Sequence, residues 1–244
     1  MGGIVSALFI ALQIQSNHIQ MSYYFMFVIL FFVGAYFEDA YKKKELPHFF
    51  KASGVLALAA VVGVCINISN LYHTYEYSKE TMRGKSELKQ EGAAASQTSS
   101  GLDRDYITNW SYGIGETLTL LVPNVKGGGS GSTMSQSEAA MAKANPMYNG
   151  IYSQLPQYFG EQPWTAGPVY VGAFVMFLFV LGCFIVKGPL KWALLGATIF
   201  SILLSWGKNF MGLTDFFIDY VPMYNKFRAV CSILVIAEFP LHLL

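Results

Sequence analysis

Charged residues are scarce in this chain of 244 amino acids. Lysine, arginine, aspartate and glutamate together make up 13% of it, against roughly a quarter in a soluble domain. The formal net charge is only +1 at pH 7, so the chain has no general attraction to nucleic acid or to acidic lipid. We therefore expect no nucleic-acid partner.

Cysteine is also rare, with three residues in the whole sequence, each inside an apolar run. Cys65, Cys183 and Cys231 show no CxxC spacing and have no histidine at a ligand spacing. This pattern argues against a disulfide framework and against a zinc site, and it favours small apolar side chains within helices.

Hydrophobic residues, in contrast, make up 53% of the chain. A soluble fold of this length has no interior large enough for such an apolar mass. A bilayer can solvate it instead, through spanning helices of about 20 mainly apolar residues. The runs that meet this need are 21–37, 49–68, 167–186 and 190–206, and two more, 2–14 and 228–244, are cut by the chain ends.

These runs predict an all-α polytopic membrane protein with about six transmembrane helices, of which the terminal two are truncated. The N-terminus lacks the basic region and the small-residue cleavage motif of a secretory signal. We therefore expect a fragment of a longer membrane protein. Its predicted parts are helices one to three in 1–69, one large extracytoplasmic loop region in 70–165, and helices four to six in 166–244.

Lysines in two short loops predict the orientation. Residues 42–44 are all lysine, and Lys187 and Lys191 flank the turn between two later runs. Short lysine-rich loops lie on the cytoplasmic side of a membrane. Two spans separate these loops, so both can be cytoplasmic, and residues 70–165 then lie on the outer face.

Within the outer region, residues 126–144 are rich first in glycine and serine and then in alanine, serine and methionine. We interpret this stretch as a flexible linker. Its segment 127–132 lacks the Gly-Lys-Ser/Thr ending of a phosphate-binding loop, so that alternative is disfavoured.

Polar residues cluster at two places close to the predicted outer ends of spans. Asn17 and His18 lie at the tip of the first hairpin, where polar groups tend to line cavities; the alternative is a solvated surface loop. Glu76 and Arg83 follow the run 49–68, and each is three or four residues from another charged residue, the spacing of one helix face. They form either part of a binding site or an ion-paired, solvated helix face.

A third cluster combines Asp103, Arg104, Trp110 and Glu116. Carboxylates can act as bases, an aromatic ring can stack on a sugar, and arginine can clamp a phosphate. The mixture therefore suits a sugar or phosphate ligand; the alternative, which the residue types favour, is a folded loop with ordinary surface ion pairs.

Lys226 and Arg228 lie at the mouth of the last apolar run. Orientation does not require positive charge there, so binding of a lipid phosphate is one interpretation. The other interpretation is that both side chains snorkel to the interface.

Several segments resemble bacterial YfhO-like membrane proteins, in the same order along the chain. Residues 12–24 resemble the Asn-His-Pro-Gln … Tyr-Tyr segment of that family, with Ile19 in place of the proline. The other similar segments are 81–88, 101–106, 110–116 and 224–228.

The resemblance implies a relationship to the C-type membrane glycosyltransferases and a place in the bacterial inner membrane. Such enzymes move a sugar from a polyprenyl-phosphate donor to a cell-envelope polymer or lipid acceptor on the outer face. Their catalytic acid lies in the first outer loop, which precedes this chain, so no residue here is matched to it. We therefore expect the fragment alone to be inactive.

The expected reaction is an inverting sugar transfer, in which an acidic base deprotonates the acceptor and basic side chains stabilise the leaving phosphate. The sequence assigns no cofactor, although a divalent metal is compatible with it. The candidate substrate- and phosphate-binding residues are Asn17, His18, Glu76, Arg83, Asp103, Arg104, Trp110, Glu116, Lys226 and Arg228.

Two other classes stay open. A lipid or solute transporter, or a flippase, predicts charged or broken helices near the middle of the membrane. The four full runs have no acid or base near their centres, with Glu238 in the last run as the exception. The third class is a non-catalytic scaffold of the cell envelope.

Overall fold

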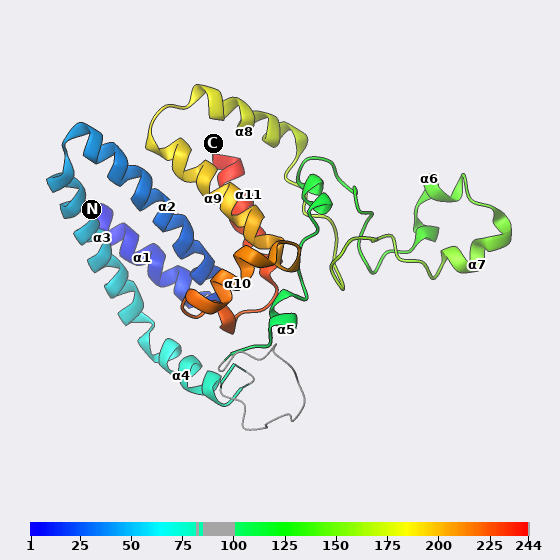
Figure 1. Cartoon of the computed structure of the whole chain (residues 1–244), viewed down its shortest axis with the longest axis horizontal. Coiled ribbons are helices and arrows are strands. Elements are labelled where there is room, and N and C mark those ends of the chain that lie inside the picture. The colour runs from blue at the N-terminus through cyan, green and yellow to red at the C-terminus, as the bar shows by residue number, and fades with distance from the viewer. Residues whose placement is uncertain (82, 85–100, 244) are drawn as a thin grey trace.

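The computed structural model describes residues 1–81, 83–84 and 101–243. Their regular secondary structure is helical, and their one β-pairing is an isolated bridge between Thr133 and Pro156. The all-α prediction is thus confirmed for the described part. Figure 1 shows long helices side by side and an arm carrying α6 and α7 that projects away from them.

The bundle helices are α1 (Gly2–Gln15), α2 (Ile19–Lys43), α3 (Leu46–Ile66), α4 (Ile68–Lys79), α8 (Ala173–Ile185), α9 (Pro189–Ser205), α10 (Met211–Tyr220) and α11 (Leu234–Leu243). The connections contain shorter elements, which are α5 (Arg104–Thr108), η1 (Gly115–Leu120), η2 (Met134–Gln136), α6 (Glu138–Met141), η3 (Pro146–Tyr148), α7 (Asn149–Tyr152), η4 (Gly207–Phe210), η5 (Tyr224–Lys226) and η6 (Val230–Ile233).

Local sequence explains where the main helices begin and end. Lys42 and Lys43 occupy the last turn of α2, where positive charge interacts favourably with the helix dipole. Lys44 follows in the left-handed conformation that commonly ends a helix. Prolines stand in the first turns of α3 and α9, where a missing backbone N–H costs no hydrogen bond.

Helices α1 and α3 pack closely along each other. Gly63 permits this approach, because a Cβ there would lie 2.7 Å from Ile10 Cγ2 and 3.2 Å from the Ala11 backbone nitrogen. The buried Asn67 side chain adds hydrogen bonds to the carbonyls of Ala11, at 3.0 Å, and Gly63, at 3.1 Å. A small residue at a close crossing beside a polar side chain is a packing mode of membrane helices.

Helix α9 is the centre of a second group, with α2, α10 and α11. The rings of Phe27, Phe200 and Phe217 meet there, with centroid distances of 5.4 Å, 5.8 Å and 5.6 Å. Each such aromatic contact contributes about 0.5–1.5 kcal/mol beyond area burial. This aromatic cluster therefore joins α2, α9 and α10.

The number of membrane spans differs from the prediction. Helices α2 and α3 are each long and apolar enough to cross a membrane, and α9 with the segment Gly207–Tyr220 is a third candidate, bent by 107°. Helices α1, α8 and α11 are apolar but shorter. The described residues thus contain two candidate spans, or three with the bent pair, and the predicted six is wrong.

The run 167–186 shows why the sequence overestimated the number of spans. Only Ala173–Ile185 is helical, with 13 residues, and this helix is about 20 Å long against a hydrocarbon core of about 30 Å. Gly172 precedes it with φ 106°, and Val186 is extended. Hydropathy counts apolar residues whatever their backbone conformation, so the extended ends were counted with the helix.

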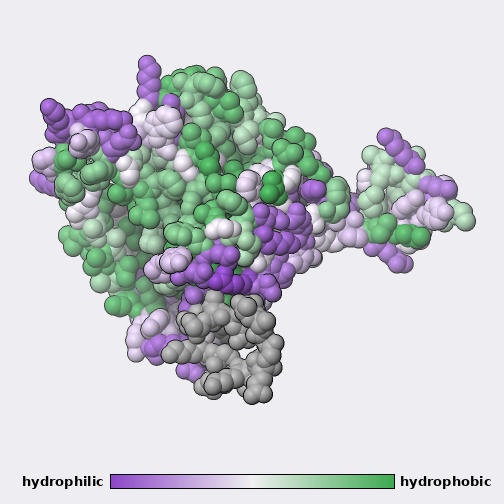
Figure 2. All heavy atoms as spheres, viewed as in Figure 1, coloured by the Kyte–Doolittle hydropathy of each residue, from purple (hydrophilic) through white to green (hydrophobic). Residues whose placement is uncertain are grey.

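The two lysine-rich loops lie at one end of the bundle. Lys42 lines the same small pocket as Gly188 and Pro189 of the α8–α9 turn. Figure 2 shows hydrophilic residues gathered at the ends of an otherwise largely hydrophobic surface. The two loops are therefore neighbours in the folded structure.

The glycine- and serine-rich stretch predicted as a flexible linker has backbone partners on the returning chain. Ser130 N–H donates to the Thr165 carbonyl, and Gln157 N–H donates to the Ser132 carbonyl, both at 2.8 Å. A Cβ at Gly127 would lie 1.7 Å from the Gln157 carbonyl oxygen. Glycine here allows two backbones to approach closely, a role that composition does not separate from flexibility.

We expect Gly63→Val to lower the free energy of unfolding by about 1–3 kcal/mol, because the added side chain overpacks the α1–α3 contact. Gly54→Val, on the same helix, is the control, since a Cβ there meets no heavy atom within 4 Å. Thermal unfolding of both purified variants in one detergent measures the difference. Equal unfolding midpoints for the two variants would contradict this contact.

Candidate functional site

Residues 221–228 cross the first turns of α2. We call this end of the bundle, opposite the lysine-rich loops, the polar end. The Gln20 side chain donates to the Arg228 carbonyl at 2.7 Å, and the Tyr23 hydroxyl donates to the Pro222 carbonyl at 2.8 Å. Both donors lie in the first turns of α2. This helix end therefore positions the segment that carries Lys226 and Arg228.

Arg83 and Lys226 are brought together from distant parts of the chain. Arg83 Nε donates to the Lys226 carbonyl at 2.9 Å, and Lys226 Nζ donates to the Arg83 carbonyl at 2.7 Å. Each bond uses one donor of a group that has several. Other donors of both cations thus stay available to a ligand.

Arg228 is exposed and held against two aromatic rings. Its guanidinium carbon lies 5.7 Å from the Tyr106 ring centroid and 5.6 Å from that of Trp110. One guanidinium nitrogen also donates to the Tyr106 hydroxyl at 2.8 Å. Trp110 in turn donates its indole N–H to the Trp164 carbonyl at 3.3 Å. The aromatic pair therefore restricts the orientation of this cation.

Arg83, Lys226 and Arg228 form what we call the cationic cluster. The ion pairs found among the described residues all involve other side chains. Neighbouring positive charges without a carboxylate partner favour an anion, and arginine and lysine both bind phosphate oxygens through charge-assisted hydrogen bonds. The chemistry of the cluster thus matches a phosphate.

Arg104, predicted as a phosphate ligand, has its charge already paired. Its guanidinium donates to Asp215 and, at 2.6 Å, to Asp219, both on α10. The hydrogen bond to Asp219 raises the pKa of the guanidinium. Arg104 therefore ties α5 to α10 and positions the outer loop on the bundle.

Glu116 is buried in η1 and accepts three hydrogen bonds. Tyr158 hydroxyl donates to Oε1 at 2.8 Å, Gln162 Nε2 donates to Oε1 at 3.2 Å, and Gly113 N–H donates to Oε2 at 3.2 Å. Burial raises the pKa of Tyr158, and the Glu116 carboxylate raises it further. Glu116 thus anchors the returning arm to η1.

The other predicted site residues have local roles in the structure. Asn17 accepts from the Asn70 side chain at 3.2 Å, and His18 is exposed at the start of α2. Glu76 pairs with Lys79 at 2.7 Å on the exposed surface of α4. Asp103 caps α5 by accepting from Asp105 N–H at 2.8 Å.

Of the ten predicted residues, the structure brings two pairs into contact, Arg83 with Lys226 and Trp110 with Arg228, and Lys226 and Arg228 are two residues apart in the chain. Sequence reasoning did not select Tyr106 and Gln20, which contact Arg228. A single tyrosine or glutamine gives no sequence signal of such a contact. The spacing of Asp215 and Asp219, four residues apart, does indicate one helix face and could have suggested a shared basic partner.

No group of three or more histidine, cysteine, aspartate or glutamate side chains in the described part of the chain could hold a metal ion. Comparisons of the chain with protein-family models, with curated proteins and with solved structures find no match.

We expect Arg104→Gln to lower the free energy of unfolding by about 1–3 kcal/mol, because two aspartates one turn apart lose their shared cation. The double variant Arg104→Gln with Asp219→Asn is expected to lose less than the sum of the single changes. Denaturant unfolding of the four proteins in the cycle measures this coupling. Strict additivity would show that the pair contributes nothing.

We expect Glu116→Ala to loosen the arm, because three donors lose their acceptor at a cost of about 1–3 kcal/mol for each buried donor left without a partner. Limited trypsin digestion, followed by mass spectrometry, should then show faster cleavage after Lys126 and Lys143. Glu138→Ala, at an exposed position in α6, is the control and should be cleaved like the unchanged protein. If Glu116→Ala also behaves like the unchanged protein, Glu116 does not anchor the arm.

Proposed function

We propose that this chain is part of a membrane protein whose polar end binds the phosphate of a lipid-linked sugar. The observation that carries the proposal is the cationic cluster, three positive side chains without a carboxylate partner among the described residues. The cluster lies beside the end of α2, one of the helices able to cross a membrane. A lipid phosphate combines the charge and the location that such a site requires.

The reaction we propose for the whole protein is sugar transfer from a polyprenyl-phosphate donor to an envelope polymer or lipid. Negative charge develops on the leaving phosphate as the glycosidic bond breaks, and fixed cations stabilise it. Arg228, oriented by Tyr106 and Trp110, is suited to this role because it needs little reorganisation. The base that deprotonates the acceptor is assigned to no residue of this chain.

The proposed orientation follows from the two lysine-rich loops. They share one end of the bundle, and short loops of this kind lie in the cytoplasm. The polar end then faces outward from the bacterial inner membrane, with the arm and the cationic cluster on the same outer face.

The bend between α9 and α10 favours a second candidate, a lipid or solute transporter. Transporters build binding sites from discontinuous helices near the middle of the membrane. The bend here lies beside the outer loop instead, because the Ser205 carbonyl accepts from Tyr112 N–H at 2.8 Å. Lipid phosphate binding is therefore the stronger proposal.

We expect Arg228→Gln to weaken binding of geranylgeranyl phosphate by about tenfold, which corresponds to about 1.4 kcal/mol. Binding of geranylgeraniol, which has no phosphate, should not change. Lys187→Gln, an exposed lysine at the opposite end of the bundle, is the matched control for loss of one charge. Affinities are measured on the full chain in nanodiscs of neutral lipid.

Retention of the full preference for phosphate in both Arg228→Gln and Lys226→Gln would overturn the proposal. Movement of lipid across vesicles by the parent protein, without any sugar transfer, would favour the transporter instead.

A further inference from the structure

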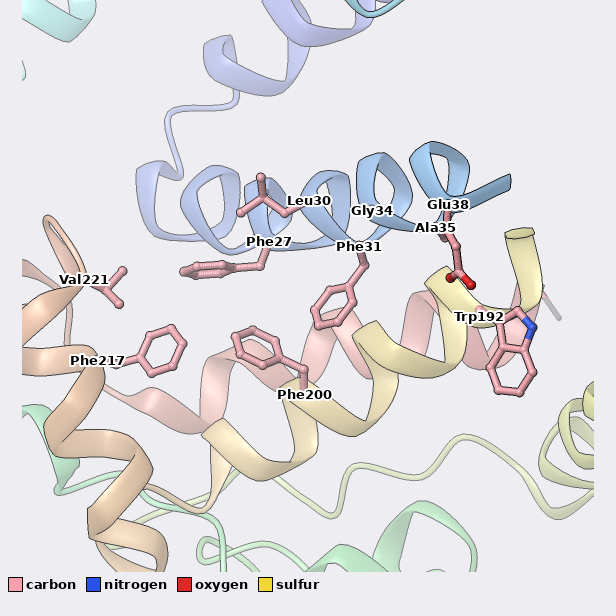
Figure 3. Close-up of a pocket in the computed structure, with 10 residues that line it drawn as sticks. All are labelled: Phe27, Leu30, Phe31, Gly34, Ala35, Glu38, Trp192, Phe200, Phe217 and Val221. Carbon is pink, nitrogen blue, oxygen red and sulfur yellow. The ribbon is translucent and has the colours of Figure 1, made fainter. Parts of the chain in front are cut away.

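An apolar groove runs between α2, α9 and α10, with a volume of about 560 Å³. Phe27 and Phe31 of α2 point toward Phe200 and Phe217, which lie opposite, as Figure 3 shows. Val221 lines the end nearest the polar end of the bundle. Apolar side chains therefore line the groove along most of its length.

The far end of the groove is polar. Glu38 lines it there beside Trp192, and its carboxylate pairs with Lys42 at 2.5 Å. A hydrocarbon chain has no favourable partner at such an ion pair. The apolar stretch from Phe27 to Glu38 therefore measures about 16 Å along the helix, roughly half of a hydrocarbon core of about 30 Å.

One face of α2 connects the groove to the cationic cluster. Tyr23 and Gln20 continue the stripe of Phe31 and Phe27 at intervals of three and four residues, so they lie on the same side of the helix. The Tyr23 ring lies 5.3 Å from the Phe27 ring and 5.0 Å from the Phe227 ring. Phe227 stands between Lys226 and Arg228 in the sequence, so the Tyr23 ring connects the groove residue Phe27 to the segment that carries both cations.

We propose that this groove holds the hydrocarbon chain of a prenyl phosphate whose phosphate binds the cationic cluster. The inference rests on the proposed function for the phosphate and adds a separate site for the chain. Positive charge at one end and an apolar groove at the other complement the two halves of one amphiphile. A single groove takes one chain, which fits a prenyl phosphate and leaves the second chain of a diacyl lipid without a site.

Gly34 provides a direct test, because it lines the groove and a Cβ there would meet no heavy atom within 4 Å. Gly34→Leu therefore fills the groove without a clash, and leucine favours the helix more than glycine does. Gly54→Leu on α3 is the matched control, with the same change at a position equally free of contacts and outside the groove.

The probes are geranyl phosphate and geranylgeranyl phosphate, which share a headgroup and differ twofold in chain length. In nanodiscs of phosphatidylcholine, the unchanged chain should bind the longer probe about tenfold more tightly, since more apolar surface is buried. Gly34→Leu should remove most of that preference and leave binding of the shorter probe unchanged. Gly54→Leu should behave like the unchanged chain. Ala35→Leu, a second change that enlarges a side chain lining the groove, should repeat the result of Gly34→Leu.

An undiminished chain-length preference in both Gly34→Leu and Ala35→Leu would overturn the groove assignment. Equal displacement of the longer probe by dioleoyl phosphatidic acid would overturn the choice of a single-chain lipid. The two proposals can fail independently. An unchanged preference for phosphate in Arg228→Gln contradicts only the phosphate site, whereas an unchanged chain-length preference in the groove variants contradicts only the groove.

Discussion

Phe27, Phe200 and Phe217 bring three helices to one point, and most of the site depends on this aromatic cluster. It fixes α2 against α9 and α10, so the first turns of α2 lie under residues 221–228. It also leaves one side of the contact open as the groove. Without this packing, neither the cationic cluster nor the groove would have a fixed position relative to the other.

Charge at the polar end separates into two groups with different roles. Arg104 is neutralised by two aspartates and holds α5 on α10, while Glu116 is satisfied by three donors and holds the arm on η1. Arg83, Lys226 and Arg228 instead bond to carbonyls and a hydroxyl, or lie on aromatic rings. A hydrogen bond to a neutral group orients a cation without cancelling its charge, which suits these three residues to an anionic ligand.

The sequence predicted the helical class, because apolar mass is a local property of the chain. It predicted six spans where the structure has two or three candidates, since hydropathy does not register the extended residues that shorten α8 or the bend after α9. Backbone conformation decides the length of a helix, and it depends on partners far away in the chain. The close approach of Gly127 to the Gln157 backbone is another such contact, which glycine content does not predict.

For the site, the sequence by itself determined which side chains carry charge and which apolar segments lie beside them. That was sufficient to select Arg83, Lys226 and Arg228 as candidates. Only the tertiary structure decided that Arg104 and Glu116 are already satisfied while those three cations have no carboxylate partner among the described residues. The physical reason is that the availability of a charge depends on its neighbours in space, and these come from segments more than one hundred residues apart.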